Sequence, residues 1–473
     1  MLRDAPFRVG GNMARMSAPL HDPEAPREPV RLKLAALRAE PLPATFKGLP
    51  AIAEGVFLQD LDRLKLSLLD GDLPLPAAIL KESALTHNAR WMRAFTERAG
   101  VSLAPHGKTT MAPQLFQRQF DEGAWGMTAA TAAHVRTYRR FGVPRVILAN
   151  QLVGKADLEL VFRELAADPS FDFFVLVDSA AGLDLLRTAA IAHGLTRPVQ
   201  VLLELGTPGG RTGVRSVEEG AALAALIQAA SPAIALRGVE AFEGVYSGAD
   251  TARVELGALT MIETVAELTR RGCADGWFAP GEVLLSAGGS AFFDMAAKTL
   301  AAVEAGGTGH ALRVVLRSGC YLSHDSLQYE RMQDRMRQRA GALWGEGPGL
   351  RNAIEVWAYV QSVPEPGRAI CTAGRRDLSY DACLPQPLWW YRQRTHDAPQ
   401  AAPGSWTVSK LNDQHAFVDA VAAADAGEGA LPLRVGDLIA FGVGHPCTTF
   451  DKWPLLYTVD DGYRVTGGVR TFF

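Results

Sequence analysis

The chain has 473 residues, of which 48% are hydrophobic and 21% are charged, as is ordinary for soluble globular proteins. A formal net charge of -3 gives no indication of a nucleic-acid or anionic-membrane partner. No apolar run approaches the ~20 residues that a membrane-spanning helix needs. Five cysteines without a CxxC pair argue against a disulfide framework and favour a reducing cytoplasm. This length predicts at least two domains.

Residues 1–45 differ in composition from the rest of the chain. They are rich in arginine and proline and show no apolar periodicity, so we expect a mobile N-terminal extension. Acidic residues such as Asp4 and Asp22 argue against a transit peptide, and there is no apolar core for a secretory signal. Met13 or Met16 could equally be the start of translation.

Residues 46–330 alternate short apolar runs with helix-like segments. The pattern predicts eight strands, at residues 101–105, 125–128, 145–150, 171–178, 200–206, 238–244, 282–287 and 312–318. Ser216-x-x-Glu219 is a capping box after the fifth strand, and Ser179 and Gly194 bracket the helix after the fourth. This count predicts an α/β fold, a TIM-like (β/α)8 barrel, with an open doubly wound sheet as the alternative.

The pattern changes after about residue 330. Residues 353–360, 438–441 and 455–459 form short β-like runs, and turns rich in proline and glycine separate them. We therefore expect residues 331–473 to form a smaller, mainly β domain.

The ends of the predicted barrel strands carry residues suited to catalysis, because the carboxyl ends of barrel strands meet at one face. Lys108 follows the first strand, and a lysine held there can lose its proton and form an imine. Gly107 beside it would let a bulky ring approach the backbone. Arg211, after the fifth strand, could hold the phenolate oxygen of a pyridoxal ring. For Lys108 and Arg211 alike, the alternative is a solvated surface charge.

The segment Ser286-Ala-Gly-Gly-Ser290 follows the seventh predicted strand. Its bare backbone amides and its hydroxyl suit a phosphate, and a plain glycine-rich turn is the alternative. Tyr246 and Tyr321 follow the sixth and eighth strands, so they would converge on the same face.

A second candidate site lies near the C-terminus, at His445-Pro-Cys447. Residues two apart on an extended chain point to the same side, and imidazole with thiolate suits zinc. Water or substrate would complete the coordination, as a Lewis-acid site requires. Two ligands alone do not define a metal site, so the pair is a hypothesis. His415 is either a partner of this pair or a buried, hydrogen-bonded histidine.

Seven motifs in order resemble the family of D-serine dehydratases and D-threonine aldolases, which are fold-type III pyridoxal-phosphate enzymes related to alanine racemase. The motifs are Pro76–Lys81, Pro105–Thr109, Leu148–Asn150, Glu204–Val214, Ser286–Ser290, Leu378–Asp381 and His445–Cys447. The likeness covers the chain from about Gly71 onward. It implies a barrel with a β domain, a homodimer, pyridoxal 5'-phosphate, and a divalent metal beside it: zinc first, with manganese or magnesium as alternatives.

The resemblance also implies roles for single residues. Lys108 would form the Schiff base, Arg211 would contact the ring oxygen, and Tyr246 and Tyr321 would contact the ring or the substrate. The phosphate would bind Gly288, Gly289 and Ser290, and the metal would bind His445 and Cys447. The sequence departs from the family where Ser290 replaces a threonine, where Gln414-His415 replaces a Glu-His pair, and where Arg375-Arg376 precede the Leu378–Asp381 motif.

Two reactions of a small D-amino acid follow from this resemblance. The first is elimination, which converts D-serine or D-threonine to a 2-oxo acid and ammonia. The alternative is retro-aldol cleavage of a D-3-hydroxy amino acid to glycine and an aldehyde. Within the family a cysteine as second metal ligand is typical of dehydratases and an aspartate of aldolases, so Cys447 favours elimination. Racemisation through Tyr321 and non-catalytic cofactor binding are weaker alternatives, and the β domain argues against the second.

Overall fold

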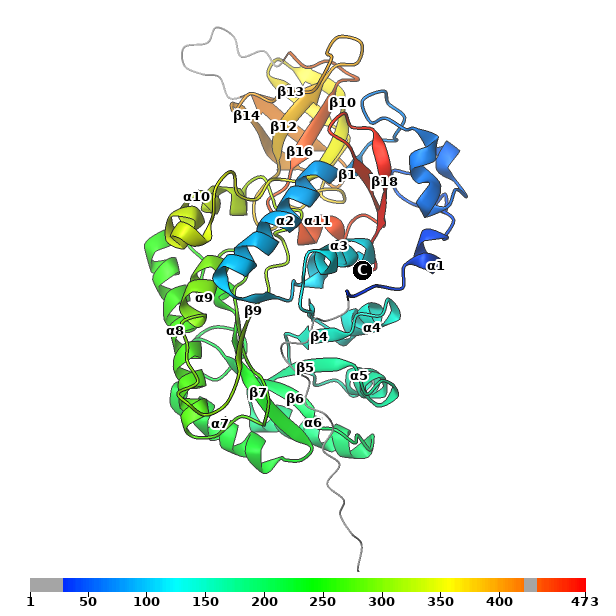
Figure 1. The fold of residues 1–473 in the computed structure, drawn as a ribbon. Helices are drawn as coiled ribbons and strands as arrows, with labels where there is room; N and C mark the ends of the chain where they lie inside the picture. The colour runs from blue at the N-terminus through cyan, green and yellow to red at the C-terminus, as the bar shows by residue number, and fades with distance from the viewer. Residues whose placement is uncertain (1–28, 421–431) are drawn as a thin grey trace, which may run out of the picture.

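The computed structural model describes residues 29–420 and 432–473, which form a parallel and an antiparallel sheet (Figure 1). The parallel sheet has eight strands in the order β2-β9-β8-β7-β6-β5-β4-β3. Their bounds are β2 Ser102–Leu103, β3 Met127–Ala129, β4 Arg145–Leu148, β5 Asp172–Val177, β6 Val199–Leu205, β7 Ile234–Ala241, β8 Val283–Ala287 and β9 Leu312–Leu316. Strand β7 begins four residues earlier than predicted, because Ile234 to Leu236 are already buried in the sheet.

The two edge strands of this sheet, β2 and β3, meet and close the barrel. The amide of Trp125 donates to the carbonyl of Leu103 at 2.7 Å, and the amide of Thr128 donates to Pro105 at 2.9 Å. His106 and Thr128 form a parallel bridge between the same two segments. Closure confirms the predicted (β/α)8 barrel and excludes the open sheet.

Side chains fill the interior of the barrel in two layers. The deeper layer is apolar and consists of Ala104, Ile147, Phe174, Leu176, Leu202, Leu284 and Val315. Glu204, Glu240 and Ser286 form the next layer, since Glu240 is the register partner of both Glu204 and Ser286. Residues two apart on a strand share a face, so this buried polar layer lies at the carboxyl ends of the strands. We call this end the mouth of the barrel.

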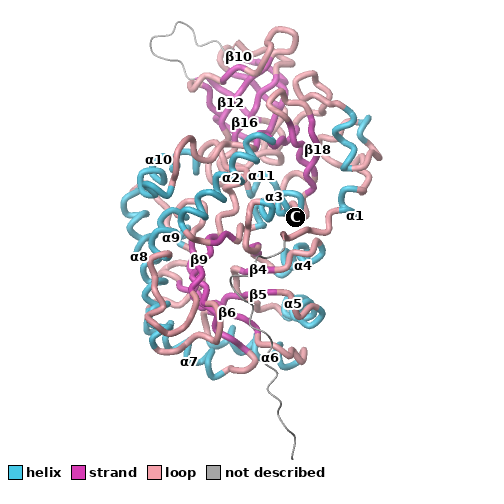
Figure 2. Tube along the Cα trace, in the orientation of Figure 1, coloured by secondary structure: helices cyan, strands magenta, loops and turns pink. Residues whose placement is uncertain are grey.

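Helix α2 precedes the first barrel strand, and helices α3 to α9 follow barrel strands and cover the outside of the sheet (Figure 2). Their bounds are α2 Glu82–Ala99, α3 Pro113–Asp121, α4 Ala132–Arg140, α5 Lys155–Ala167, α6 Ala180–Ala192, α7 Val217–Ala229, α8 Thr251–Ala274 and α9 Phe293–Leu300. The predicted caps are present: Ser216 accepts from the amide of Glu219 at 3.2 Å, and Ser179 accepts from Gly182 at 3.2 Å. The Glu219 carboxylate accepts from the amide of Arg215.

The antiparallel sheet confirms the predicted β-rich region after residue 330. Its strands are β1 Ala77–Lys81, β10 Ile354–Glu365, β11 Arg368–Cys371, β12 Gln386–Tyr391, β13 Gln400–Ala401, β14 Trp406–Leu411, β15 Ala416–Ala420, β16 Leu438–Gly442, β17 Leu455–Val459 and β18 Val465–Arg470. Strand β1 pairs with β10 and β17, although it precedes the barrel in sequence. The predicted bounds 46–330 and 331–473 stay a prediction, and β1 falls within the range expected for the barrel.

Three further helices and five 3-10 turns complete the described structure. They are α1 Ala35–Arg38, α10 Gln328–Ala340 and α11 Cys447–Phe450, with 3-10 turns η1 Ala51–Ala53, η2 Leu58–Leu64, η3 Gly107–Thr109, η4 Glu243–Val245 and η5 Gly341–Leu343. Residues 29–45 differ from the expected mobile extension, because Leu32, Leu34, Leu37 and Leu42 in this stretch are buried. Residues 1–28, with Met13 and Met16, lie outside the described residues. In the part of the chain that is described, no helix is long and apolar enough to cross a membrane.

Candidate active site

Lys108 lies at the mouth of the barrel, on the turn η3 that follows strand β2. The amides of Thr110 and Met111 donate to the carbonyl of Gly107 at 3.2 Å and 2.8 Å and hold the turn. Lys108 is exposed, whereas Gly107 and Thr109 on either side are buried. A Cβ atom at position 107 would collide with the hydroxyl of Tyr138. The glycine is therefore needed for packing against Tyr138, and the approach of a cofactor ring to its backbone stays a prediction.

Two neutral imidazoles lie near Lys108. Burial, and then the charge of Lys108, lower the pKa of His134. The same two causes lower the pKa of His106 well below its ordinary value. The amide of Ala130 donates to Nδ1 of His134 at 3.3 Å. Neither histidine was predicted from the sequence, and both follow barrel strands as Lys108 does.

Arg317, directly after strand β9, links the polar layer of the mouth. Its guanidinium pairs with Glu240 and donates to the hydroxyl of Ser286 at 2.8 Å and to the carbonyl of Ala241 at 2.9 Å. Burial raises the pKa of Glu240 to about 8, although Arg317 opposes the shift. One carboxylate oxygen of Glu240 has no partner among the described residues. Arg317 is a buried cation that the sequence analysis did not single out.

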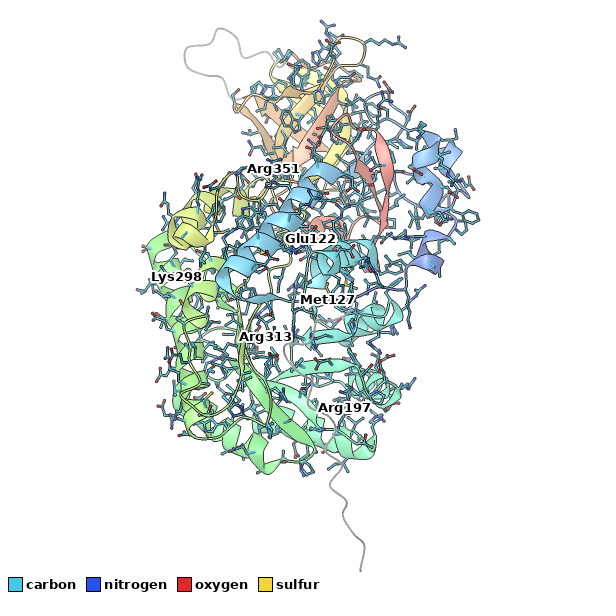
Figure 3. The ribbon with its side chains drawn as sticks, viewed as in Figure 1. Glu122, Met127, Arg197, Lys298, Arg313 and Arg351 are labelled. Carbon is cyan, nitrogen blue, oxygen red and sulfur yellow. The ribbon has the colours of Figure 1, made fainter. Side chains whose placement is uncertain are left out.

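Replacing Arg317 by leucine should destabilise the protein by about 3–5 kcal/mol, because Glu240 would stay buried without its ionic partner. Arg313, on strand β9 and labelled in Figure 3, provides the control. It pairs with Glu282 at 2.7 Å, and both side chains keep more than a fifth of their surface exposed. Such a pair contributes about 0–1 kcal/mol. Urea unfolding of both variants measures the difference, and equal losses would contradict the buried network.

The raised pKa of Glu240 predicts how stability depends on pH. The ordinary value is 4.5, so between about pH 4.5 and about pH 8 the folded protein keeps a proton that the unfolded chain has lost. Stability should therefore fall as pH rises through this window and level off above it. Glu240→Gln removes this titration and should flatten the profile. Urea unfolding at a series of pH values tests it, and an unchanged slope would assign the dependence to other groups.

Arg211 lies on the loop that follows strand β6, and its guanidinium is 5.0 Å from the centre of the Phe242 ring. Arg215 braces this loop by donating to the carbonyls of Thr212 at 2.6 Å and Arg211 at 3.0 Å. The hydroxyl of Tyr246 donates to Thr207 on the same loop at 3.1 Å. Tyr246, which follows strand β7, therefore contacts the loop that carries Arg211, and the roles predicted for the two residues stay predictions.

Two amides of the predicted phosphate-binding segment already donate to a carboxylate, which would compete with a phosphate. The buried carboxylate of Glu243 accepts from the amides of Gly288 at 3.2 Å and Gly289 at 2.6 Å. These two amides are therefore engaged, and a phosphate there would meet a carboxylate. Among the described residues no acceptor is found for the amide of Ser290. Ser290, which lies beside the hydroxyl of Tyr329, is the part of the segment that fits a phosphate best.

Tyr321 is buried away from this cluster, in the hydrophobic core and beside Gln119. Tyr329, on helix α10, takes the place expected for Tyr321, because it lies beside Ser290 and near Cys320 and Cys447.

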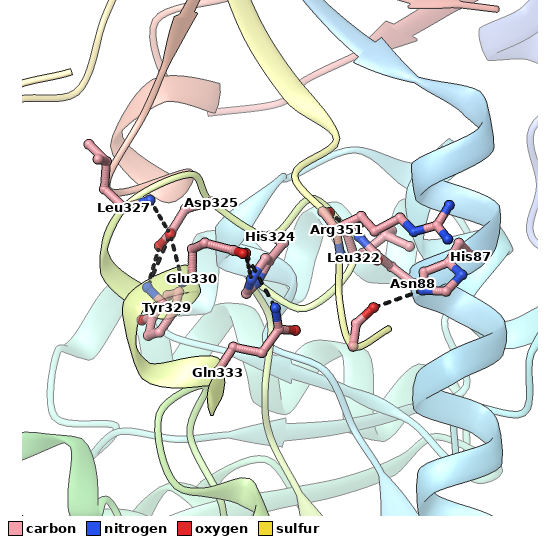
Figure 4. Close-up of polar contacts among 11 residues, drawn as sticks. His87, Asn88, Leu322, His324, Asp325, Leu327, Tyr329, Glu330, Gln333 and Arg351 are labelled. Atoms are coloured by element: carbon pink, nitrogen blue, oxygen red, sulfur yellow. Dashed lines mark hydrogen bonds and ion pairs between the residues drawn. The ribbon is translucent and has the colours of Figure 1, made fainter. Parts of the chain in front are cut away.

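Polar contacts fix the segment that leads from strand β9 to Tyr329 (Figure 4). Asn88 donates to the carbonyls of Leu322 at 2.9 Å and Arg351 at 2.7 Å. Asp325 accepts from the amides of Leu327 at 2.9 Å and Tyr329 at 3.0 Å. Asp325 lies two residues before the N-cap position Leu327, and it still bonds to the first turn of α10 through the amide of Tyr329.

His445 and Cys447 lie together, but on a turn and not on an extended strand. Strand β16 ends at Gly442, and Pro446 has helical dihedrals of -56° and -41° at the start of α11. The sequence prediction of an extended chain is therefore wrong, and proline geometry explains the turn. Nδ1 of His445 is 2.5 Å from the Asp381 carboxylate, which also accepts from Thr448 at 2.7 Å. Asp381, and not His415, is the partner of His445.

The contact with Asp381 engages Nδ1 and leaves Nε2 of His445 for a metal, as in carboxylate–histidine–metal arrangements. Hydrogen bonding to Cys447, together with Asp381, raises the pKa of His445 to about 9. A hydrogen bond from Cys320, and then His445, hold the pKa of Cys447 well below its usual range. The donor set fits a borderline-soft metal such as zinc. Across residues 29–420 and 432–473, no group of three such ligands could hold a metal ion.

Thr109 joins the two candidate sites. Its hydroxyl lies 3.5 Å from the sulfur of Cys447, and Thr109 directly follows Lys108 in sequence. Helix α11 connects β16 and β17 of the antiparallel sheet, and this contact joins it to the turn that carries Lys108. The His445–Cys447 pair therefore lies against the turn that carries Lys108, at the mouth of the barrel.

Comparisons with known proteins agree with this architecture. The model "Alanine racemase, N-terminal domain" matches residues 80–307, and "Putative serine dehydratase domain" matches residues 353–459. The chain is 26% identical to a D-threonine aldolase of Arthrobacter sp. over 394 residues, 82% of this chain and 89% of the relative. It is 24% identical to the 3-hydroxy-D-aspartate aldolase of Paracoccus denitrificans (strain Pd 1222) over 322 residues, 67% and 76% of the two chains.

Solved structures show the same fold. The D-threonine aldolase from Filomicrobium marinum superposes with a TM-score of 0.67 at 21% identity, covering 86% of this chain and 97% of that one. The D-threo-3-hydroxyaspartate dehydratase from Delftia sp. HT23 gives 0.64 at 19% identity, covering 86% and 99%. The chain thus belongs to the alanine racemase-like, fold-type III pyridoxal-phosphate enzymes, in the group of D-serine dehydratases and D-threonine aldolases. This is a family of pyridoxal-phosphate-dependent lyases.

Proposed function

We propose that the protein is a pyridoxal-phosphate- and metal-dependent D-amino-acid ammonia-lyase that converts D-serine or D-threonine to a 2-oxo acid and ammonia. The observation that carries the proposal is the His445–Cys447 pair, oriented by Asp381 and joined through Thr109 to the turn of Lys108. When bound, the cofactor supplies an electron sink for the α-carbon, and the metal supplies a Lewis acid for the β-hydroxyl.

The residues at the mouth divide the work of binding and proton transfer. We assign Lys108 to hold the cofactor and to move the α-proton at Nζ, since its amine is exposed between buried neighbours. The braced guanidinium of Arg211 would bind the ring oxygen. The hydroxyl and amide of Ser290 would bind the phosphate, with Gly288 and Gly289 shaping the turn and Tyr246 bordering the ring.

His445 and Cys447 would hold the metal, and zinc is the first choice for an imidazole and a thiolate. With two protein ligands, the remaining positions are left for water and the substrate hydroxyl. Structures of the D-threo-3-hydroxyaspartate dehydratase include a metal-free form and alanine mutants of a histidine and a cysteine two positions apart. The same two residue types at the same spacing support a dehydratase role for this chain.

The second candidate is retro-aldol cleavage of a D-3-hydroxy amino acid to glycine and an aldehyde. The relatives that are 26% and 24% identical are aldolases, and this favours it. The two reactions differ at the β-hydroxyl. It leaves the substrate in elimination, whereas in aldol cleavage it stays and loses its proton. Cys447 is our reason for preferring elimination.

A product assay separates the two candidates. Purified protein with added pyridoxal phosphate and zinc is given D-serine, D-threonine and 3-hydroxy-D-aspartate, with the L-enantiomers as controls. Elimination releases ammonia and a 2-oxo acid in equal amounts, whereas aldol cleavage releases glycine and an aldehyde. Glycine without ammonia would overturn the ammonia-lyase proposal in favour of the aldolase. Light scattering of the same preparation tests the proposed homodimer, and the predicted cytoplasmic location stays a prediction.

A further inference from the structure

Cys320 lies directly beside the proposed metal ligand Cys447, and no role has been given to it so far. The two sulfurs are 3.6 Å apart, within hydrogen-bonding distance, and the Thr109 hydroxyl is 3.9 Å from the sulfur of Cys320. The two cysteines are 127 positions apart in the chain. Cys320 follows barrel strand β9, whereas Cys447 begins α11. The contact therefore joins the two halves of the site.

The arrangement does not make Cys320 a third metal ligand. Among the described residues, no three histidine, cysteine, aspartate or glutamate side chains could hold one ion. A second thiol in contact with a reactive one has another chemical consequence. Peroxide converts one cysteine of such a pair to a sulfenic acid, and a second sulfur 3.6 Å away is close enough to react with the product and form a disulfide.

The two cysteines differ in exposure, as is expected for a reactive cysteine and the cysteine that resolves its product. Cys447 is partly exposed, whereas only 5% of Cys320 is exposed, so Cys447 is the more accessible residue of the pair. Cys320 is buried, and its sulfur lies 3.6 Å from the sulfur of Cys447. The buried partner is shielded from direct oxidation and is already placed to react with its neighbour.

We propose that Cys320 and Cys447 form a reversible disulfide under peroxide stress, and that this bond switches the site off. The Cys447 sulfur attacks hydrogen peroxide, breaks the O–O bond and becomes a sulfenic acid with release of water. The Cys320 sulfur then attacks the sulfenic sulfur, and the S–O bond breaks with release of a second water. Two thiols and one peroxide thus give one disulfide and two waters, and a dithiol reductant reverses the change.

The disulfide removes the Cys447 sulfur from metal binding, because a disulfide sulfur is no longer a thiolate ligand. Bound metal should in turn protect Cys447, since the metal occupies the electrons that attack the peroxide. The expected loss of metal depends on the proposed function of His445 and Cys447 as metal ligands. The expected formation of the disulfide does not depend on it. The two claims can therefore fail separately.

The test treats full-length protein, with and without zinc, with hydrogen peroxide and maps the cysteines by mass spectrometry. We expect the metal-free protein to lose two hydrogen atoms and to give a cross-linked peptide pair containing Cys320 and Cys447. The zinc content of the loaded protein should fall at least tenfold. It should return once the protein has been reduced with dithiothreitol, freed of the reductant and given zinc again, and zinc present beforehand should slow the cross-link. Turnover of the substrate found in the product assay, relative to untreated protein, should fall and return in parallel.

Two variants sharpen the test. Cys320→Ser leaves no resolving thiol, so peroxide damage at Cys447 should proceed past the sulfenic acid and resist dithiothreitol. Cys383→Ser is the matched control, because Cys383 is also half-buried and lies against Gly444 in the same region. This control should oxidise and recover like the unmodified protein.

Three outcomes would overturn the proposal. The first is absence of the 320–447 cross-link, or a cross-link from Cys383 in its place. The second is full recovery of oxidised Cys320→Ser by dithiothreitol. The third is loss of zinc from reduced Cys320→Ser, which would make Cys320 a ligand. If no D-amino acid is turned over, the proposed function fails while the cross-link and zinc measurements still decide this one.

Discussion

Lys108→Ala should lower turnover of the D-amino-acid substrate by at least about a thousandfold. A positioned acid–base group alone contributes about 10²–10⁴-fold, and this residue is also assigned to hold the cofactor. The variant should keep its fold, because the side chain is exposed and its turn is held by backbone bonds to Gly107. The visible absorption of the cofactor-loaded protein should be lost at the same time.

Borohydride reduction identifies the lysine independently of activity. In the unmodified protein the reduced cofactor should stay attached to one peptide, and that peptide should contain Lys108. Lys298→Ala is the control, since Lys298 is an exposed lysine on α9, outside the mouth (Figure 3). Label on another lysine peptide, or full turnover by Lys108→Ala, would show that the cofactor lysine has been assigned wrongly.

The barrel was predictable because its strands are buried on both faces. The run Asp172–Val177 forms β5 with five buried residues in a row, and an apolar run of this kind indicates a strand from sequence alone. Strand β1 was not predictable in the same way. Ala77–Lys81 has the same apolar character, but its partners are β10 and β17, far away in sequence. Local pattern predicts that a strand forms and does not predict which sheet receives it.

The candidate site was predictable as far as it depends on strand ends. Lys108 and Arg211 follow parallel strands, so the barrel rule alone places them at one mouth. Contacts between neighbouring loops were not predictable. Glu243 engages the amides of Gly288 and Gly289 only because the loops after β7 and β8 meet. Tyr329, and not Tyr321, lies beside Ser290, on the segment whose backbone amides bond to Asp325.

Removing the metal should slow the elimination of hydroxide much more than the elimination of chloride. Stripping zinc with a chelator, or replacing Cys447 by alanine, should slow elimination of hydroxide from D-serine by about a hundredfold or more. A Lewis acid contributes several kcal/mol to such a step, and 1.36 kcal/mol corresponds to a factor of ten. The absorption of the bound cofactor should stay, because Lys108, Arg211 and Ser290 remain in place.

β-Chloro-D-alanine tests the reason for this loss, because chloride leaves without help from a Lewis acid. Its turnover by the metal-free protein should fall much less than that of D-serine, at most about tenfold. Asp381→Asn gives an intermediate case: it weakens the contact that orients His445 while both proposed ligands remain. Loss of an outer-shell partner typically costs about 10–100-fold in metal affinity or activity. Excess zinc should therefore restore D-serine turnover in Asp381→Asn and not in Cys447→Ala. If chelation slows both substrates equally, the metal holds the site in shape, and activation of the hydroxyl is not its task.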